Sequence, residues 1–224
     1  MIARIEKGIH FDNIHSYYDL NLILSGLDIP PAKPKTYYIE IEGADGSLDL
    51  TEVHGEVKFS DREGKFIFTL DPNTCDLSDE GFELKKTQVS TMLSGKVFKI
   101  VLDRDSQYYY QGRCTVDEFL SDKRIRQIVI SVKLHPYKFK NEETVVTCEL
   151  TSEFQTITLS NGRKFVIPEI ICSNDNTSVV FNGSNYTFNA GTHKNLGIQL
   201  VEGENIVEVK GSGTIEFRYR EGDL

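Results

Sequence analysis

The sequence predicts an all-β protein with one short helix, arranged as two domains. Three observations predict this class: strict alternation of apolar and polar residues, Asn-Gly pairs typical of hairpin turns, and little helical periodicity. Successive side chains of a strand point to opposite faces of a sheet, so alternating segments form sheets with one face in a core. At 224 residues, the chain is long enough for two domains of ordinary size.

Alternation is clearest in four segments, and we expect each apolar row to lie on the core side of a strand. The rows are Phe66, Phe68 and Leu70; Phe98, Ile100 and Leu102; Ile128, Ile130, Val132 and Leu134; and Ile215, Phe217 and Tyr219.

Hairpins are predicted at two Asn-Gly pairs in the second half of the chain. Asn161-Gly162 lies between the β-like segments 157–159 and 165–167. Asn182-Gly183 lies between the β-like segments 179–181 and 186–188. A type I′ turn needs positive φ at both central residues, which Asn followed by Gly tolerates best. Short strands at this spacing are typical of a sandwich or jelly roll.

The best candidate for a helix is residues 84–93. Val89, Met92 and Leu93 have helical spacing there, and Gly95 provides a stop after the last turn. One helix in an otherwise alternating chain does not make a βαβ protein.

A domain boundary is predicted near residues 138–144. The strand that ends at Leu134 runs into Pro136, which cannot donate a ladder hydrogen bond, and then into a polar, charged segment. Beyond it the sequence is rich in Asn, Thr and Gly. We therefore expect domains at 1–140 and 141–224.

Charge and composition exclude several classes of protein. The net charge of −9 argues against binding to nucleic acid or to anionic lipid, both of which depend on Lys and Arg. We expect no membrane span, because no segment approaches about 18 consecutive apolar residues. The first residues lack the apolar region of a secretory signal, so folding in a cytoplasm is expected.

The cysteines do not indicate a metal or disulfide framework. Cys75, Cys114, Cys148 and Cys172 contain no CxxC pair, and zinc sites need closely spaced ligands. We expect Cys148 and Cys172 to behave as small buried hydrophobic residues of strands.

No catalytic, cofactor-binding or metal-binding residues are predicted. The histidines are scattered, and the chain has no GxSxG nucleophile motif. Residues 71–81 resemble a calcium loop, but Asp76 stands where an EF-hand needs glycine, so we expect a polar loop in which Ser78 or Asp79 caps the next element of the chain. Residues 103–105 are predicted to form a turn, with calcium binding by Asp103 and Asp105 as the alternative.

Residues 28–35 contain Pro30, Pro31 and Pro34 and should be extended and stiff. Such a segment is either a rigid connector between strands or a preformed arm that another subunit grips with little loss of entropy. The residues themselves favour the connector.

Several segments, in order, resemble the distal tail proteins of long-tailed bacteriophages. The N-terminal segments are 20–25 (LNLILS), 27–31 (LDIPP), 34–38 (PKTYY), 43–52 (GADGSLDLTE), 95–103 (GKVFKIVLD), 108–113 (YYYQGR) and 135–138 (HPYK). The segments 191–193, 211–214 and 217–224 are similar to the galectin-like C-terminal domain of the same family.

The resemblance implies a non-enzymatic structural protein at the tip of a virion tail, assembled in the bacterial host cytoplasm. It implies an N-terminal β-sandwich or barrel-like domain, with an arm and a helix, that closes into a hexameric ring. It also implies a C-terminal galectin-like jelly-roll sandwich. Such a ring joins the tail tube protein to a tail-associated fibre or lysin protein, lets DNA pass without recognising it, and holds receptor-binding proteins in some members. Contacts between subunits or with the tube are expected at Pro30, Pro31, Asp45, Gly46 and Asp49.

Two other classes of function stay open. A carbohydrate-binding β-sandwich for host-surface adhesion would share the architecture, although sugar sites usually expose aromatic faces and the chain has no Trp. Consecutive residues of Tyr108-Tyr109-Tyr110 point to opposite faces of a strand, so they do not form one platform. A glycoside hydrolase would need two facing carboxylates.

Overall fold

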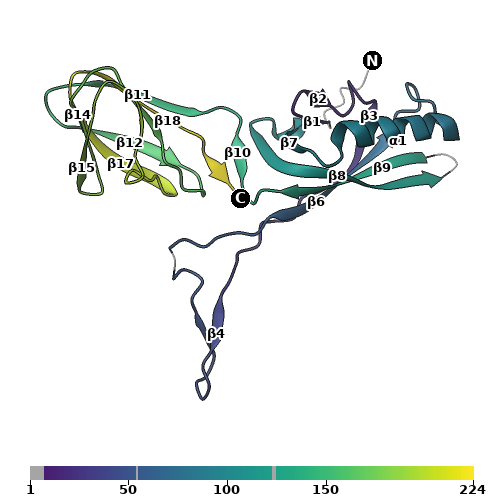
Figure 1. Cartoon of the computed structure of the whole chain (residues 1–224), viewed down its shortest axis with the longest axis horizontal. Helices are drawn as coiled ribbons and strands as arrows, with labels where there is room; N and C mark the ends of the chain where they lie inside the picture. The colour runs from purple at the N-terminus through teal and green to yellow at the C-terminus, as the bar shows by residue number, and fades with distance from the viewer. Residues whose placement is uncertain (1–7, 54, 123–124) are drawn as a thin grey trace. The chain divides into compact units, whose positions relative to one another are not determined.

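The computed structural model describes residues 8–53, 55–122 and 125–224 (Figure 1). The chain divides into two compact units, Met1–Lys138 and Phe139–Leu224, which we call unit 1 and unit 2 and describe separately. Strands dominate both units, and α1 (Asp79–Leu93) is the one α-helix of the described residues, so the all-β prediction is confirmed. Whether the units act as the domains predicted at 1–140 and 141–224 stays a prediction.

Unit 1 is built on antiparallel strands in the order β2-β1-β7-β8-β9-β6-β3. A separate pair, β4 with β5, lies outside this order. The bounds are β1 (Ile9–Phe11), β2 (Ile14–His15), β3 (Leu22–Asp28), β4 (Tyr38–Glu40), β5 (Ser47–Asp49), β6 (Arg62–Leu70), β7 (Val97–Leu102), β8 (Tyr108–Asp122) and β9 (Ile125–Leu134), with a 3₁₀ turn at Asp103–Asp105.

The sheet of unit 1 curls on itself. Strands β1 and β6 stand four places apart in the sheet, a separation of about 19 Å if the sheet were flat. The rings of Phe11 on β1 and Phe66 on β6 nevertheless have centroids 6.2 Å apart, and Phe11 also contacts Phe68 and Phe98. Only a strongly curved sheet brings these strands face to face, which gives unit 1 the barrel-like form that was expected.

Helix α1 contributes to this core. Ser78 is its N-cap and its hydroxyl accepts a hydrogen bond from Gly81 N–H, as its residue type favours. Phe82, Val89 and Leu93 are buried. The helix starts five residues before the predicted start of 84, while its predicted end at 93 is correct.

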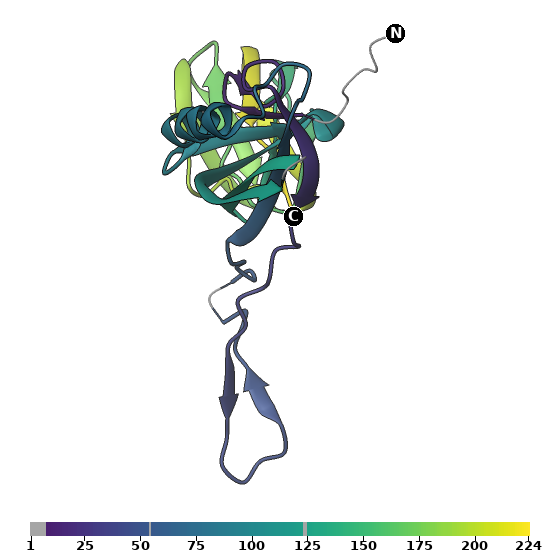
Figure 2. The same ribbon diagram turned by 90° about the vertical axis from the view of Figure 1, so that its right-hand side faces the viewer.

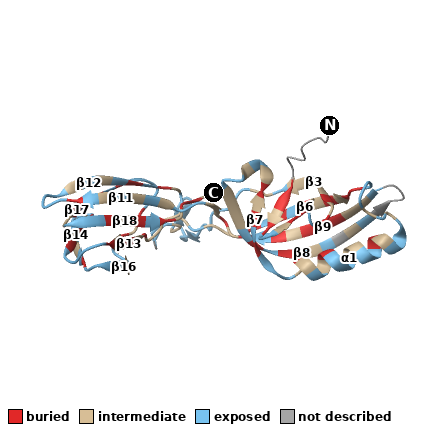
Figure 3. Cartoon of the chain, turned by 90° about the horizontal axis from the view of Figure 1, so that it is seen from above, coloured by how far each residue is buried: buried red, intermediate tan, exposed pale blue. Residues whose placement is uncertain are grey.

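Unit 2 is a sandwich of two antiparallel four-stranded sheets, in the orders β11-β18-β13-β16 and β12-β17-β14-β15. Buried residues alternate with less buried ones along its strands (Figure 3). The strands of the sandwich are β11 (Thr144–Leu150), β12 (Gln155–Asn161), β13 (Glu169–Cys172), β14 (Thr177–Phe181), β15 (Ser184–Phe188), β16 (Gly191–Lys194), β17 (Gly203–Lys210) and β18 (Gly213–Tyr219). Outside the sandwich, β19 (Gly222–Asp223) pairs with β10 (Lys138–Lys140), which contains the point of division.

All four predicted apolar rows are buried. Each of their side chains is at most 6% exposed, and they divide between the two cores. Cys172 is buried as expected, but Cys148 is only partly buried and its thiol donates to Gln155 Oε1 at 3.2 Å. The cysteines of the chain are all free thiols.

The two Asn-Gly pairs have different outcomes. Asn182 and Gly183 have φ of 49° and 77° and join β14 to β15, so this hairpin is confirmed. The predicted hairpin at Asn161-Gly162 is wrong, because β12 pairs with β17 instead. The Asn161 side chain is buried and its Nδ2 donates to the carbonyl oxygens of Lys164 and Leu200. This asparagine ties a loop to the sheet and does not form a turn.

Candidate functional site

The most exposed part of unit 1 is a projecting arm, which we define as residues 30–60 (Figure 2). It contains β4 and β5, and its root is held as a ribbon by a bridge between Pro34 and Phe59. At its far end the chain turns through Gly43 and Gly46, whose φ values of 82° and 77° suit glycine. The ring of Phe59 packs edge-on against Tyr137, with centroids 5.9 Å apart. The proline-rich segment thus connects β3 to β4, as favoured, and forms the root of the arm. That another subunit grips it stays a prediction.

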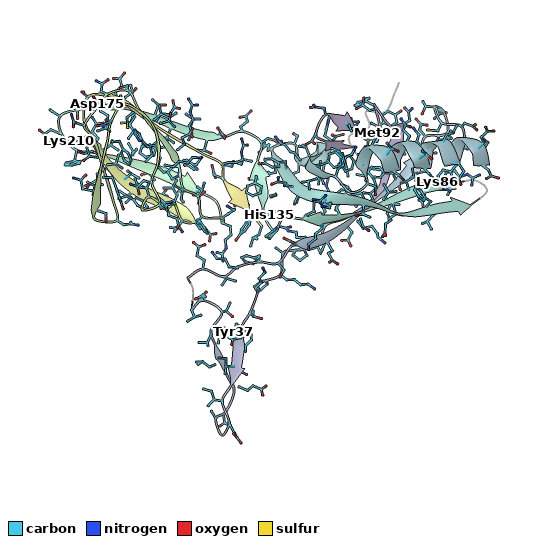
Figure 4. The ribbon with its side chains drawn as sticks, viewed as in Figure 1. Tyr37, Lys86, Met92, His135, Asp175 and Lys210 are labelled. Atoms are coloured by element: carbon cyan, nitrogen blue, oxygen red, sulfur yellow. The ribbon has the colours of Figure 1, made fainter. Side chains whose placement is uncertain are left out.

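The arm has one apolar and one polar face. Ile39 lies opposite Leu48, and Tyr38 lies opposite Asp49. Since opposite residues of a ladder share a face and neighbours alternate, these two pairs occupy opposite faces. The apolar face of the arm consists of Tyr37, Ile39, Ile41, Leu48 and Leu50, and the polar face carries Tyr38, Glu40, Ser47 and Asp49. Figure 4 shows the side chains of this ribbon, with Tyr37 labelled.

The apolar face is exposed in the part of unit 1 that the structure describes. The side chains of Tyr37, Ile39, Ile41 and Leu48 are 57%, 37%, 51% and 48% exposed. A two-stranded hairpin is at best marginally stable in water by itself, so an apolar face on such a ribbon gains most from being covered. Complete burial of one large aliphatic side chain contributes about 1.5–3 kcal/mol. Contiguous exposed apolar residues of this kind mark interaction surfaces.

The structure divides the predicted contact residues between the two ends of the arm. Asp45 and Gly46 lie at the tip, and Asp49 lies on the polar face. Hydrogen bonds from Thr51 lower the pKa of the Asp49 carboxyl. Pro30 and Pro31 lie at the root, where Pro30 is half-buried and Pro31 is exposed. Their role in contacts between subunits stays a prediction.

Sequence reasoning missed the residues that make the apolar face. The signal was present: residues 37–41 alternate, and Leu48 and Leu50 continue the pattern after the turn. Alternation predicts a strand with one buried face, but it does not reveal whether the cover comes from the same chain.

A second cluster joins residues far apart in the sequence at a corner of unit 1. The Asp103 carboxylate accepts hydrogen bonds from Gly8 N–H at 2.8 Å and from His15 Nε2 at 3.2 Å. His10 Nε2 lies 3.5 Å from its other oxygen. Two histidines and one carboxylate at such distances have the composition of a metal site.

Hydrogen bonding argues against that assignment. The backbone N–H groups of Tyr17 and Tyr18 both donate to His15 Nδ1, at 3.1 Å each. Nδ1 of His15 is therefore an acceptor, and the proton of the neutral ring is on Nε2, where it is donated to Asp103. A metal ligand needs the reverse, a bare Nε2 with an N–H at Nδ1. The cluster fixes the corner between β2 and the 3₁₀ turn.

The two acidic segments considered for calcium are held by contacts within the protein. Asp105 pairs with Lys138 at 3.2 Å, so its carboxylate and that of Asp103 serve different partners. The carboxylate of Asp71 accepts hydrogen bonds from Asn73 and Tyr17, which lower its pKa. These contacts explain both segments as local turns.

The exposed surface of unit 2, all of which the structure describes, does not present the flat aromatic platform that sugars prefer. Phe154, in the connection between β11 and β12, is its one exposed large aromatic side chain. Thr and Ser of β12 and Glu of β17 are exposed on one outer sheet face. The tyrosines at 108–110 belong to unit 1, where Tyr110 packs on the core and Tyr108 lies under the Lys138 ammonium.

None of the helices in the described ranges has the length and apolarity that a membrane crossing requires. No family model and no curated protein matches the sequence. Among solved structures, the chain is similar to the crystal structure of the Dit protein of phage SPP1, with a TM-score of 0.71 and 12% sequence identity. The match covers 96% of this chain and 98% of that chain. SPP1 Dit is described as a paradigm of the hub of the adsorption apparatus in phages that infect Gram-positive bacteria. Over nearly its whole length, this chain therefore has the fold of SPP1 Dit.

Proposed function

We propose that this chain is the hub protein at the tail tip of a long-tailed phage, a prophage or a device derived from one. Six copies form a ring that joins the tail tube protein to a tail-associated fibre or lysin protein and leaves a passage for DNA. The protein acts by holding copies of itself and its neighbours, without catalysis. The galectin-like C-terminal domain lies outside the ring and is available to receptor-binding proteins.

The observation that carries this proposal is the fold shared with a phage hub protein over 96% of the chain. The arm supports it independently. Its apolar face is exposed among the described residues of unit 1, and a cyclic assembly requires each copy to present a surface that its neighbour completes.

The charge of the chain fits a conduit for DNA. A net charge of −9 disfavours adhesion to phosphates, which a passing genome must avoid. As a tail-tip hub, the protein is expected in the host cytoplasm before assembly and in assembled tails afterwards.

The test is the native mass of the full-length protein, alone and with its tail tube protein, together with negative-stain images. We expect a six-membered ring. The double variant Ile39→Ser/Leu48→Ser removes two residues of the apolar face and should abolish the ring. The variant Tyr38→Ser changes the polar face of the same ribbon and serves as the matched control, expected to assemble. A chain that stays monomeric even with the tube protein present contradicts the proposal.

A further inference from the structure

Charges are sorted along the first part of the arm, from its root to the end of β5. Its outgoing limb, residues 30–37, contains Lys33 and Lys35 and no acid. The following segment, residues 38–50, contains acids and neither Lys nor Arg. The acids of this segment, which we call the distal acids, are Glu40, Glu42, Asp45 and Asp49.

The two lysines and the distal acids are exposed charges. All are exposed, and within the described part of the chain no ion pair joins Lys33, Lys35 or a distal acid to another residue. Other charges near the root are paired locally: Lys58 with Glu56 at 3.8 Å, and Lys133 with Asp61 at 3.4 Å. Glu52 on the return limb is exposed.

Extended geometry keeps the two sets apart. Lys35 and Glu40 are five residues apart, and a strand rises about 3.3 Å per residue, so their Cα atoms are about 16 Å apart. Lysine and glutamate side chains do not bridge that distance, and Glu42 and Asp45 lie farther away. Asp49 lies nearer, opposite Tyr38, and its carboxylate accepts a hydrogen bond from Thr51 N–H at 2.9 Å. Lys33 and Lys35 of one copy therefore meet the distal acids of another copy more readily than their own.

We propose that the distal acids of one copy dock against Lys33 and Lys35 at the arm root of the next copy, an inference that rests on the proposed ring. The partner is a second copy because the chain itself carries both halves of the pairing next to its uncovered apolar face. The contact is head-to-tail, and a head-to-tail contact repeats around a ring until it closes. Charge steers the arms together and sets their direction, while the apolar face provides the burial.

Charge reversal tests this pairing directly. Variant A is Lys33→Glu/Lys35→Glu, and variant B is Glu40→Lys/Glu42→Lys. All of the substituted side chains are exposed, so both variants should fold. Variant A places like charges at every contact, and variant B takes the charge of the distal segment from −4 to zero and sets two lysines against the root. Each alone should weaken self-association at least about tenfold. In an equimolar mixture each acidic segment meets a basic one, so assembly should return with A and B alternating around the ring.

The matched control is Glu204→Lys/Glu208→Lys on β17 of unit 2, which changes the net charge as variant B does at exposed positions. It should self-associate like the wild type. Sedimentation of full-length protein at low and high salt gives the association constants, and the wild type should weaken as salt screens the contact.

The outcomes separate the two proposals. If A and B each associate like the wild type, or if their mixture does not recover, the pairing is wrong while the ring stands. A wild-type chain that does not self-associate at any concentration also overturns the pairing, and the experiment with the tube protein then decides the proposed function.

Discussion

Nε of Arg62 donates a hydrogen bond to the carbonyl oxygen of Pro136 at 2.8 Å, and Nη2 of the same side chain donates to that oxygen as well. Arg62 begins β6 directly after the arm, and Pro136 follows β9. The side chain is 6% exposed, and its guanidinium lies over the ring of Tyr110 at 5.8 Å. Burial lowers the pKa of Arg62. One cation thus fixes the return of the arm to the body of unit 1.

Replacing Arg62 should destabilise unit 1. Arg62→Met keeps the apolar stem but leaves the Pro136 carbonyl oxygen without its charged donor, a loss of about 2 kcal/mol in the free energy of unfolding. Urea denaturation measures it. Lys65→Met, at an exposed position of the same strand, is the matched control and should change stability by less than about 0.5 kcal/mol. Equal effects of the two substitutions would show that the Arg62 contact contributes nothing.

Phe11 should be one of the most costly residues to truncate. Its ring is fully buried and contacts the rings of Phe66, Phe68 and Phe98, so it closes the curled sheet. Phe11→Ala should lower the free energy of unfolding by about 3–5 kcal/mol. Leu84→Ala, at a position on α1 that is 68% exposed, is the control and should be nearly neutral. A cost below about 1 kcal/mol for Phe11→Ala would contradict the closed arrangement.

Tyr219 should make unit 2 sensitive to strong alkali. Burial raises the pKa of Tyr219 to about 12, and its hydroxyl donates to Ser160 O at 2.6 Å. Because the folded pKa exceeds the ordinary value of 10.0, the stabilisation is complete below pH 10 and is lost as the pH rises toward 12. Tyr219→Phe should cost about 1 kcal/mol at neutral pH through the lost hydrogen bond. The difference between the two proteins should shrink from pH 10 to 12, and a constant difference would refute the assignment.

Gly183 and Gly162 should resist substitution for different reasons. Gly183 has φ of 77° and open space where a Cβ would stand, so Gly183→Ala costs only backbone strain of about 1 kcal/mol. A Cβ at Gly162 would meet Asp223 Oδ1 at 2.5 Å and Gly222 O at 2.8 Å. Thermal unfolding should therefore show the larger loss for Gly162→Ala. The reverse order would mean that the loop after β12 rearranges easily.

The rows of alternating residues predicted the strands of both cores because side-chain alternation is a local property of a strand. The start of α1 was missed for a local reason too: Gly81 weakens the helical pattern, yet glycine is needed where a Cβ would meet the Asp76 carboxyl carbon at 2.5 Å. The pairing of residues from different segments is not a local property. Neither the tie from Asn161 to Leu200 nor the bond from His15 to Asp103 has a signal in neighbouring residues.

For the arm, sequence reasoning found the acidic tip and the prolines but not the uncovered face. An alternating pattern predicts which residues of a strand are buried, but not what covers them. Tyr37 and Ile41 have the pattern of a core strand, and only the fold shows that no described part of unit 1 covers them.

The arm also affects how a copy behaves after synthesis and before the proposed assembly. A newly made copy carries an open ribbon of apolar side chains, which invites wrong partners and aggregation. The acids along the same ribbon repel the acids of other arms and so oppose the association of stray copies. In the proposed ring, Lys33 and Lys35 of the next copy accept them. In the proposed assembly, the polar face of the hairpin thus keeps the single chain in solution and its apolar face holds the copies together.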